Sequence, residues 1–162
     1  MNLKPEPLPK EAFAPYGSFF DPGAVDAAPS SKTPVRFYPD QHPIFFKHSN
    51  YASVSSLILD PRPLVVDCTE YHEYCEEFSG GFGEDTVFHV GLLDGACKPD
   101  LSTFKVFSLP RGWYLRFKHH VCHMAPYVRG DKKTAGIVIL PPYTYTVDCI
   151  VINLKEKIEI TL

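Results

Sequence analysis

The chain has 162 residues and a formal net charge of -3, with acidic and basic residues interspersed along it. That length suits a single domain, 1–162, which buries roughly 70% of its unfolded surface and needs neither disulfides nor a structural metal for stability. The charge argues against nucleic-acid and anionic membrane partners, which select strongly basic surfaces. No apolar run approaches the roughly 20 residues that span a bilayer.

The cysteines and the first residues indicate the compartment. The opening stretch, "MNLKPEPLPKEAF", lacks the apolar core of a signal peptide. The five cysteines are odd in number and widely spaced, without a Cys-x-x-Cys pair, which argues against a disulfide framework and a zinc ribbon. We therefore expect a cytoplasmic protein in which most cysteines act as small buried hydrophobic residues.

Near the N-terminus the sequence predicts one short helix. In "LPKEAFAPYG", Pro9 suits the first turn, Lys10 to Ala14 continue it, and Pro15 and Gly17 end it. The next segment, 22–34, is small, polar and rich in proline, so we expect a surface loop. The sixteen prolines of the chain leave little room for further long helices.

Beyond residue 34, short runs of β-branched and aromatic residues alternate with turn residues. The runs are 34–39, 42–49, 52–60, 62–74, 85–94, 102–110, 112–123, 132–140 and 143–154. The tail, 156–162, alternates with a period of two, so Ile158, Ile160 and Leu162 share one face. Gly80, Gly81 and Gly83 favour a hairpin turn. About nine or ten short strands in one domain predict an all-β sandwich or barrel.

Two blocks resemble a known family. "PLPKEAFAPYGSFFD", 7–21, and "GACKPDLSTFKVF", 95–107, are similar to conserved stretches of the ureidoglycolate lyases. The resemblance extends over most of the chain, from about residue 3 to 155. It implies a cupin-like antiparallel β-barrel (a double-stranded β-helix, or jelly roll) that forms a homodimer. It also implies a carbon–nitrogen lyase that cleaves ureidoglycolate to glyoxylate and urea in purine (allantoin) breakdown.

The sequence departs from the pattern of that family at several positions. Where the lyases have a tract resembling His-x-x-Val-Trp-His-His-Pro, Val121 and His123 match, but Lys118 replaces the first histidine and Cys122 replaces the tryptophan. These departures leave two alternatives open, because fold survives such changes better than substrate does. One is a divergent cupin acting on another small carboxylate or sugar acid, and the other is a non-catalytic, metabolite-binding dimeric barrel.

The resemblance also implies a metal site. The cupin pattern of two histidines, a glutamate and a glycine corresponds to Glu70, His72, Glu76 and Gly83, and His123 would be the fourth ligand. Residues two apart on a strand point to the same face, so an unbulged strand would aim Glu70, His72 and Glu76 inward together. Two acids and two imidazoles suit Mn²⁺, Fe²⁺, Ni²⁺ or Zn²⁺. The alternative is a solvated strand face with no ligand function.

The tract "RFKHHVCHMAP", 116–126, holds three histidines. In an extended chain His119 and His123 share a face but lie about 13 Å apart, too far to share one metal unless a turn intervenes. We therefore expect at most one or two of the three at the site, and the motif position selects His123. Whether His119 or His120 takes part is left open.

Cleavage of a small hydroxy acid defines three roles. A cation must hold the substrate carboxylate, a base must take the hydroxyl proton, and the leaving nitrogen must gain a proton. We expect His123, His72 and Lys118 to be catalytic, with Lys118 and Arg116 binding the carboxylate. A divalent metal would bind the carboxylate and the hydroxyl together. Further cationic candidates are Arg111 and Arg36.

Overall fold

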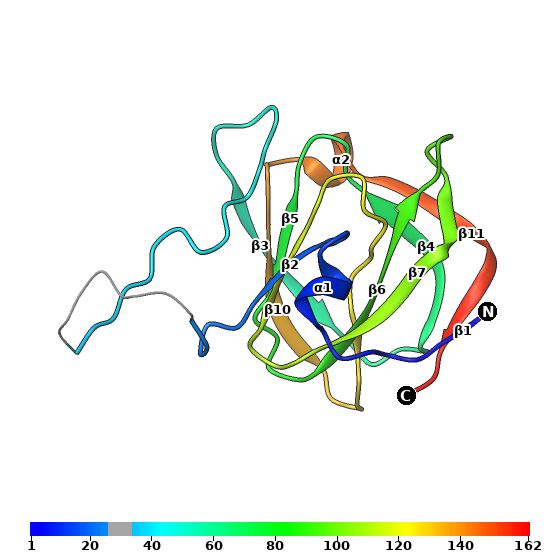
Figure 1. Ribbon diagram of the computed structural model, residues 1–162, viewed down its shortest axis with the longest axis horizontal. Coiled ribbons are helices and arrows are strands. Elements are labelled where there is room, and N and C mark those ends of the chain that lie inside the picture. The colour runs from blue at the N-terminus through cyan, green and yellow to red at the C-terminus, as the bar shows by residue number, and fades with distance from the viewer. Residues whose placement is uncertain (26–33) are drawn as a thin grey trace.

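The computed structural model describes residues 1–25 and 34–162, and strands dominate it (Figure 1). The first sheet has the order β1 (Asn2–Leu3), β11 (Ile150–Ile160), β4 (Val65–Tyr71). The second has the order β2 (Gly17–Phe20), β8 (Tyr114–Phe117), β5 (Glu77–Gly80), β10 (Thr134–Leu140), β3 (Ser53–Leu59). The third has the order β7 (Pro99–Leu109), β6 (Thr86–Leu93), β9 (Tyr127–Val128). The all-β prediction is confirmed.

All strand pairs in these sheets are antiparallel except β1 with β11. In the described part of the chain the ladders form three separate sheets and do not close into one barrel. The parallel pairing of β1 with β11 brings the N-terminus beside the C-terminal strand, as Figure 1 shows at the right of the molecule.

The predicted N-terminal helix is confirmed. Helix α1 (Lys10–Phe13) follows Pro9 and ends at Ala14, and it lies among the sheets in Figure 1. Its one buried side chain, Phe13, contacts rings from several strands. These rings are Phe19 of β2, Phe88 of β6, Phe107 of β7 and Phe117 of β8. The helix thus joins the five-stranded sheet to the β7–β6–β9 sheet through one aromatic core.

Truncation of Phe13 tests this core. Phe13→Ala removes a fully buried ring that makes edge-on contacts with Phe88 and Phe107, so we expect a loss of about 3–5 kcal/mol in the free energy of unfolding. Phe45→Ala removes the same atoms from a ring that is half exposed and is expected to cost much less. Urea denaturation of both variants measures the difference, and equal losses would contradict the assignment of Phe13 to the core.

A short segment connects two of the sheets. Cys122 bonds to Gly91 of β6 through two backbone hydrogen bonds of 2.9 Å each. Its neighbour His123 bonds to Glu70 of β4 through two more, at 2.7 and 2.8 Å. Because the segment fills the space between β4 and β6, His123 is held by backbone bonds next to the strand that leads to His72.

Several predicted elements are wrong. Segments 34–39 and 42–49 are not strands, and helix α2 (Thr144–Val147) replaces the start of the strand predicted at 143–154. Turn residues 119–120 interrupt the strand predicted at 112–123. Gly80 ends β5, and Gly81 and Gly83 lead to β6, but β5 and β6 lie in different sheets and form no hairpin. Most of the loop predicted at 22–34 lies outside the described residues, which exclude 26–33.

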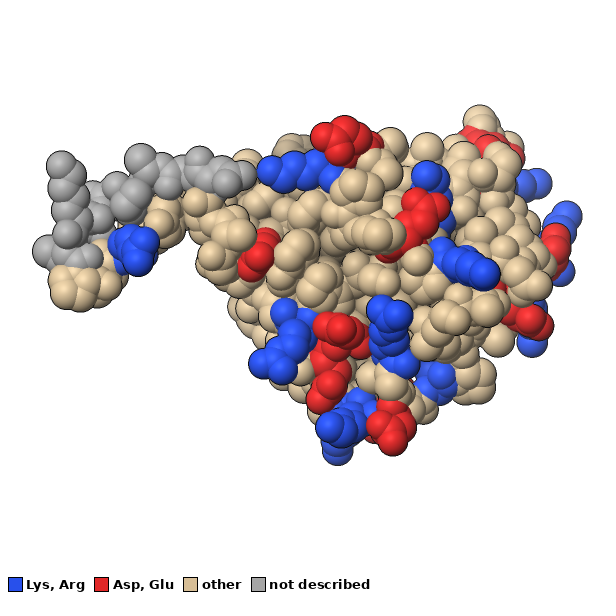
Figure 2. Space-filling model, turned by 60° about the horizontal axis from the view of Figure 1, so that its bottom comes forward, with Lys and Arg blue, Asp and Glu red and all other residues tan. Residues whose placement is uncertain are grey.

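The surface carries charges of both signs. On the face shown in Figure 2, lysine and arginine side chains alternate with aspartate and glutamate. No helix within residues 1–25 and 34–162 is long and apolar enough to cross a bilayer.

Candidate metal centre

Three buried side chains converge in the interior. The Oε2 atom of Glu77 lies 3.4 Å from Nε2 of His72 and 3.5 Å from Nε2 of His123, and the two imidazole centroids are 5.3 Å apart. The three potential ligand atoms all lie within 4.8 Å of one another. The exposed fractions are 3% for His72, 9% for Glu77 and 1% for His123. We call these three residues the triad.

A bend between two strands places His72 and Glu77. Strand β4 ends at Tyr71, the chain bends at residues 73–74, and β5 begins at Glu77. The bend breaks the alternation that an uninterrupted strand would have kept, so Glu77, and not Glu76, faces the interior with His72. Glu77 is five positions from His72, and in a continuous strand two residues an odd number of positions apart point to opposite faces. The two side chains can face each other here because the strand is interrupted between them.

A left-handed turn places His123. After β8 the chain turns at His119 and His120, and His120 has a φ of 61°. The backbone N–H of His120 donates to the carbonyl oxygen of His72 at 2.7 Å, which fixes the turn against the start of the bend. The ring of His123 then stacks on Phe117, with centroids 4.4 Å apart. His119 and His120 themselves are exposed, outside the triad.

Both imidazoles are oriented by backbone carbonyls. Nδ1 of His72 donates to the carbonyl oxygen of Asp148 at 2.6 Å, and Nδ1 of His123 donates to that of Val121 at 2.8 Å. With the proton on Nδ1, a neutral imidazole directs its Nε2 lone pair toward the partner ring and Glu77. The Nε2 atom of His123 is buried and has no hydrogen-bond partner among the described residues. Nδ1–carbonyl bonds of this kind orient metal-ligating histidines.

Electrostatics couple the members of the triad. Burial alone would raise the pKa of Glu77, but the close approach of His123 and His72 to its carboxylate, and their charges, lower it well below its usual range. Burial alone would lower the pKa of His72, but the hydrogen bond and the charge of Glu77 outweigh it and raise that pKa. Without a metal, the triad therefore holds an ionised carboxylate and favours a protonated imidazole at His72.

These shifts predict how the stability of the metal-free protein depends on pH. The raised pKa of His72 contributes stability below the usual histidine pKa of about 6.5, and this is lost as pH rises through the folded-state value. The lowered pKa of Glu77 contributes stability above the usual value of about 4.3, which is lost only on acidification. Urea midpoints of EDTA-treated protein should therefore fall between about pH 6 and about pH 8.5. A rising midpoint would contradict the coupling.

The structure places the other predicted ligands elsewhere. The carboxylate of Glu70 accepts a hydrogen bond from the thiol of Cys149 at 2.9 Å, although its backbone pairs with His123. Glu76 forms an ion pair with Arg116, at 3.1 Å between Oε2 and Nη1, and accepts a hydrogen bond from the backbone N–H of Phe45. Neither acid belongs to the triad.

The two predicted carboxylate-binding cations are also engaged. Besides its pairing with Glu76, Arg116 donates to the hydroxyl of Ser18 at 3.1 Å and to the carbonyl oxygen of Pro43 at 3.2 Å. Lys118 donates from Nζ to the carbonyl oxygen of Ala14 at 2.6 Å, at the end of α1. Arg116 thus joins β8 to β2 and to the loop at Pro43, and Lys118 binds the end of α1.

Asp148 supports the bend that carries His72. Its carboxylate accepts hydrogen bonds from the backbone N–H groups of Glu73, at 2.8 Å, and Tyr74, at 3.0 Å, and from the thiol of Cys75, at 3.4 Å. Potential ligand atoms of His72, Cys75 and Asp148 also lie within 4.8 Å of one another. Burial, followed by the hydrogen bond and charge of Asp148, raises the pKa of Cys75 to about 12, so this thiol is a poor source of thiolate.

A third buried histidine underlies the site, and the sequence patterns did not indicate it. Nε2 of His89 lies 3.0 Å from the hydroxyl of Thr69, which donates to the carbonyl oxygen of His123 at 3.1 Å. Burial, followed by the charges of His123 and Arg62, lowers the pKa of His89 to about 3, so the ring is neutral. A neutral imidazole donates from Nε2 to Thr69 and so supports the backbone of His123.

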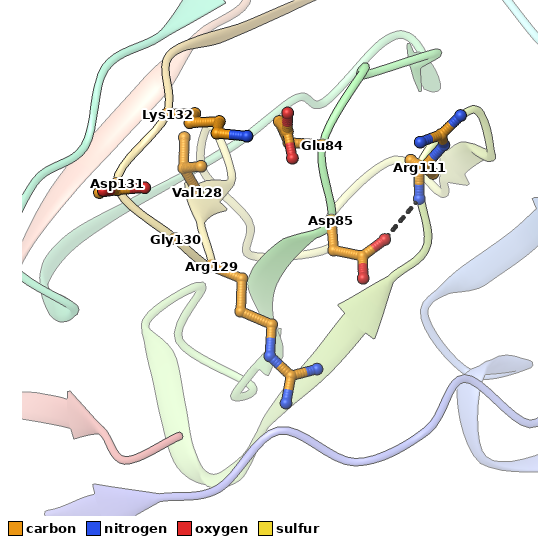
Figure 3. A pocket seen from close by; sticks show the side chains of 8 residues that line it. All are labelled: Glu84, Asp85, Arg111, Val128, Arg129, Gly130, Asp131 and Lys132. Carbon is orange, nitrogen blue, oxygen red and sulfur yellow. Dashed lines mark hydrogen bonds between the residues drawn. The ribbon is translucent and has the colours of Figure 1, made fainter.

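A charged pocket of about 390 Å³ lies at a different set of loops (Figure 3). Acidic side chains from residues 84, 85 and 131 and basic side chains from residues 111, 129 and 132 line it in equal number. The backbone N–H of Arg111 donates to Asp85 at 2.9 Å. Arg111, a candidate for carboxylate binding, therefore lies among acids and not beside the triad.

Two comparisons with known proteins found no match. No protein-family model matches the chain, and no curated protein matches it either. The assignment of a function depends on the residues of the triad and on the sequence motifs.

Proposed function

We propose that the protein is a lyase of the ureidoglycolate type, built on a cupin-like jelly roll, and that the triad is its reaction centre. The observation that carries the proposal is the convergence of His72, Glu77 and His123. Both Nδ1 atoms donate to backbone carbonyls, and Nε2 of His123 makes no hydrogen bond to any described residue. Two imidazoles and one carboxylate form a common donor set of catalytic metal sites.

The triad fits a divalent transition metal. Both histidines are oriented to present Nε2, and Glu77 supplies negative charge. Nε2 of His123 is buried and lies 3.5 Å from Oε2 of Glu77 without a hydrogen bond, so a bound ion would satisfy it. Fe²⁺, Mn²⁺, Ni²⁺ and Zn²⁺ all accept this set. Such an ion would hold the carboxylate and hydroxyl of the substrate together and make the hydroxyl more acidic.

The reaction is balanced without a co-reactant. The substrate hydroxyl loses its proton, the C–N bond breaks as the carbonyl of glyoxylate forms, and the leaving urea nitrogen gains a proton. We assign both proton transfers to Glu77, because the two imidazoles contact its Oε2 and leave Oε1 outside those contacts. Because the pKa of Glu77 is lowered, the carboxylate would hold the proton only transiently and would return it readily to the leaving nitrogen. One carboxylate oxygen that takes the proton and returns it accounts for both steps.

A bound metal would hold the substrate carboxylate in place of the basic side chains that the sequence predicts for this role. Arg116 is paired with Glu76 and Lys118 is bound to Ala14, so the proposal does not use either to hold the substrate carboxylate. Low exposure of the triad strengthens its electrostatic interactions, because little water screens them.

Urea release is the test of this function. Purified protein, stripped with EDTA and reloaded separately with Mn²⁺, Fe²⁺, Ni²⁺ or Zn²⁺, is incubated with racemic ureidoglycolate, and urea and glyoxylate are measured. We expect equimolar products with at least one metal and none after stripping. If the metal-loaded protein binds glyoxylate but releases no urea, the result would favour a different small hydroxy acid as substrate. If it neither binds glyoxylate nor releases urea, the result would favour the non-catalytic alternative. Homodimer formation, also implied by the resemblance, is measured on the same sample by light scattering.

A further inference from the structure

A second pocket lies next to the bend that carries His72. It has a volume of about 250 Å³ and is bordered by residues 48–51, the bend itself and the segment that includes α2. Its walls include the rings of Tyr51, Tyr74 and Tyr143, and Cys75 and Asp148 also line it. The pocket is thus aromatic, with a single carboxylate and one imidazole, that of His48, whose ring centroid lies 5.1 Å from that of Tyr74.

That carboxylate is buried and lacks a cationic partner. Asp148 is 8% exposed, and among the described residues its carboxylate accepts hydrogen bonds only from two backbone N–H groups and the thiol of Cys75. Within residues 1–25 and 34–162, no lysine, arginine or histidine side chain forms an ion pair with it. A buried charge without a counter-charge is costly, so a cation in the pocket would be stabilised.

The aromatic walls favour the same charge. The face of a tyrosine ring attracts cations, and Lys47 already places Nζ 5.2 Å from the ring centroid of Tyr74. Tyr143 has a φ of 65°, a left-handed conformation that is costly for a bulky residue, and its side chain is 75% exposed. Core packing therefore does not hold this ring, which lines the pocket from the start of α2.

We propose that this pocket binds a small organic cation, an ammonium or guanidinium group on a short apolar stem. The charge lies against Asp148 and the stem lies between the tyrosine rings. The volume is slightly below the roughly 300–1,000 Å³ of pockets for drug-sized ligands, which suits a smaller molecule. The proposal goes beyond the lyase function and does not depend on it. Asp148 contacts the Nδ1 side of His72, whereas Glu77 lies on the Nε2 side.

Isothermal titration calorimetry of the metal-free full chain tests the proposal. The probe is propylguanidinium, and its neutral analogue is propylurea. We expect propylguanidinium to bind at least about tenfold more tightly, because hydrogen bonds to a charged group are stronger than neutral ones. The double variant Tyr51→Ala/Tyr143→Ala should weaken the cation about five- to thirtyfold through loss of two aromatic faces. Tyr145→Ala is the matched control, since Tyr145 is also exposed and does not line the pocket.

Asp148→Asn removes the charge and is expected to abolish the preference for the cation. Because Asp148 also binds the backbone of the bend at 73–75, the thermal unfolding of the Asp148→Asn variant is measured in parallel. If this variant does not fold, the binding of propylguanidinium by the tyrosine variants tests the proposal. A peptide Ala-Arg-Ala that binds more weakly than propylguanidinium supports a free metabolite, and one that binds as tightly supports a guanidinium carried by a protein. Equal binding of propylguanidinium and propylurea, or unchanged binding by the double variant, would overturn the proposal. These readouts need no metal and no urea release, so failure of the lyase assay leaves them intact.

Discussion

Replacement of His123 by asparagine is expected to abolish metal binding and lyase turnover while leaving the fold intact. The asparagine amide can keep a donor near the position of Nδ1, where it serves the carbonyl oxygen of Val121, but it has no atom at the position of Nε2. Loss of an outer-shell partner alone costs 10–100-fold in metal affinity, so loss of a ligand should cost more than about 100-fold. Calorimetric titration with Mn²⁺ and the rate of urea release measure the two effects.

The matched control for this variant is His119→Asn. His119 belongs to the same histidine-rich tract but is exposed, and its ring packs near Phe45 and not at the triad. Its replacement should leave metal content and turnover within about twofold of wild type. Equal loss in both variants would mean that the tract acts through its overall structure and not through Nε2 of His123.

The second large effect is expected from Glu77→Gln. The change keeps the shape of the side chain but removes the charge that raises the pKa of His72 and the oxygen assigned to proton transfer. Turnover should fall by about 10²–10⁴-fold, the usual contribution of general acid–base catalysis, and metal affinity should fall with it. The pH dependence of stability in the metal-free protein should also become flatter, because the His72 pKa loses its main raising influence.

Glu76→Gln tests whether the ligand is Glu76, as the spacing pattern of the sequence predicts, or Glu77, as the triad indicates. Glu76 precedes Glu77 directly and is paired with Arg116, so its replacement should reduce stability but not metal content. Loss of metal from Glu76→Gln, with retention in Glu77→Gln, would show that the spacing pattern identifies the ligand and that the triad does not.

Local chemistry explains what the sequence could predict of the fold. The short helix follows from Pro9, Pro15 and Gly17, which act within a few residues, and the strand composition follows from β-branched and aromatic residues. The short strand β5 could not be predicted, because its pairing with β8 and β10 is decided by residues far along the chain. The pattern of alternation carries no information about such partners.

The candidate site shows the same division. His72 and His123 were selected by motif position, and the structure brings their rings together, while their role as ligands stays a prediction. Glu77 was not predicted, because the alternation of inward and outward side chains was assumed to continue through residues 73–74, where the chain bends. Asp148, more than 70 residues further along the chain, stabilises this bend. The acidic pair Glu76-Glu77 was the available signal, since one of two adjacent acids must face inward wherever a strand begins.

A crystal of the metal-loaded protein, measured at the absorption edge of the bound ion, tests the central claim most directly. We predict one strong anomalous peak within about 2.0–2.2 Å of Nε2 of His72, Nε2 of His123 and a carboxylate oxygen of Glu77. A metal-loaded crystal with no peak between these three side chains, or with its peak at Glu70 and Glu76, would contradict the account.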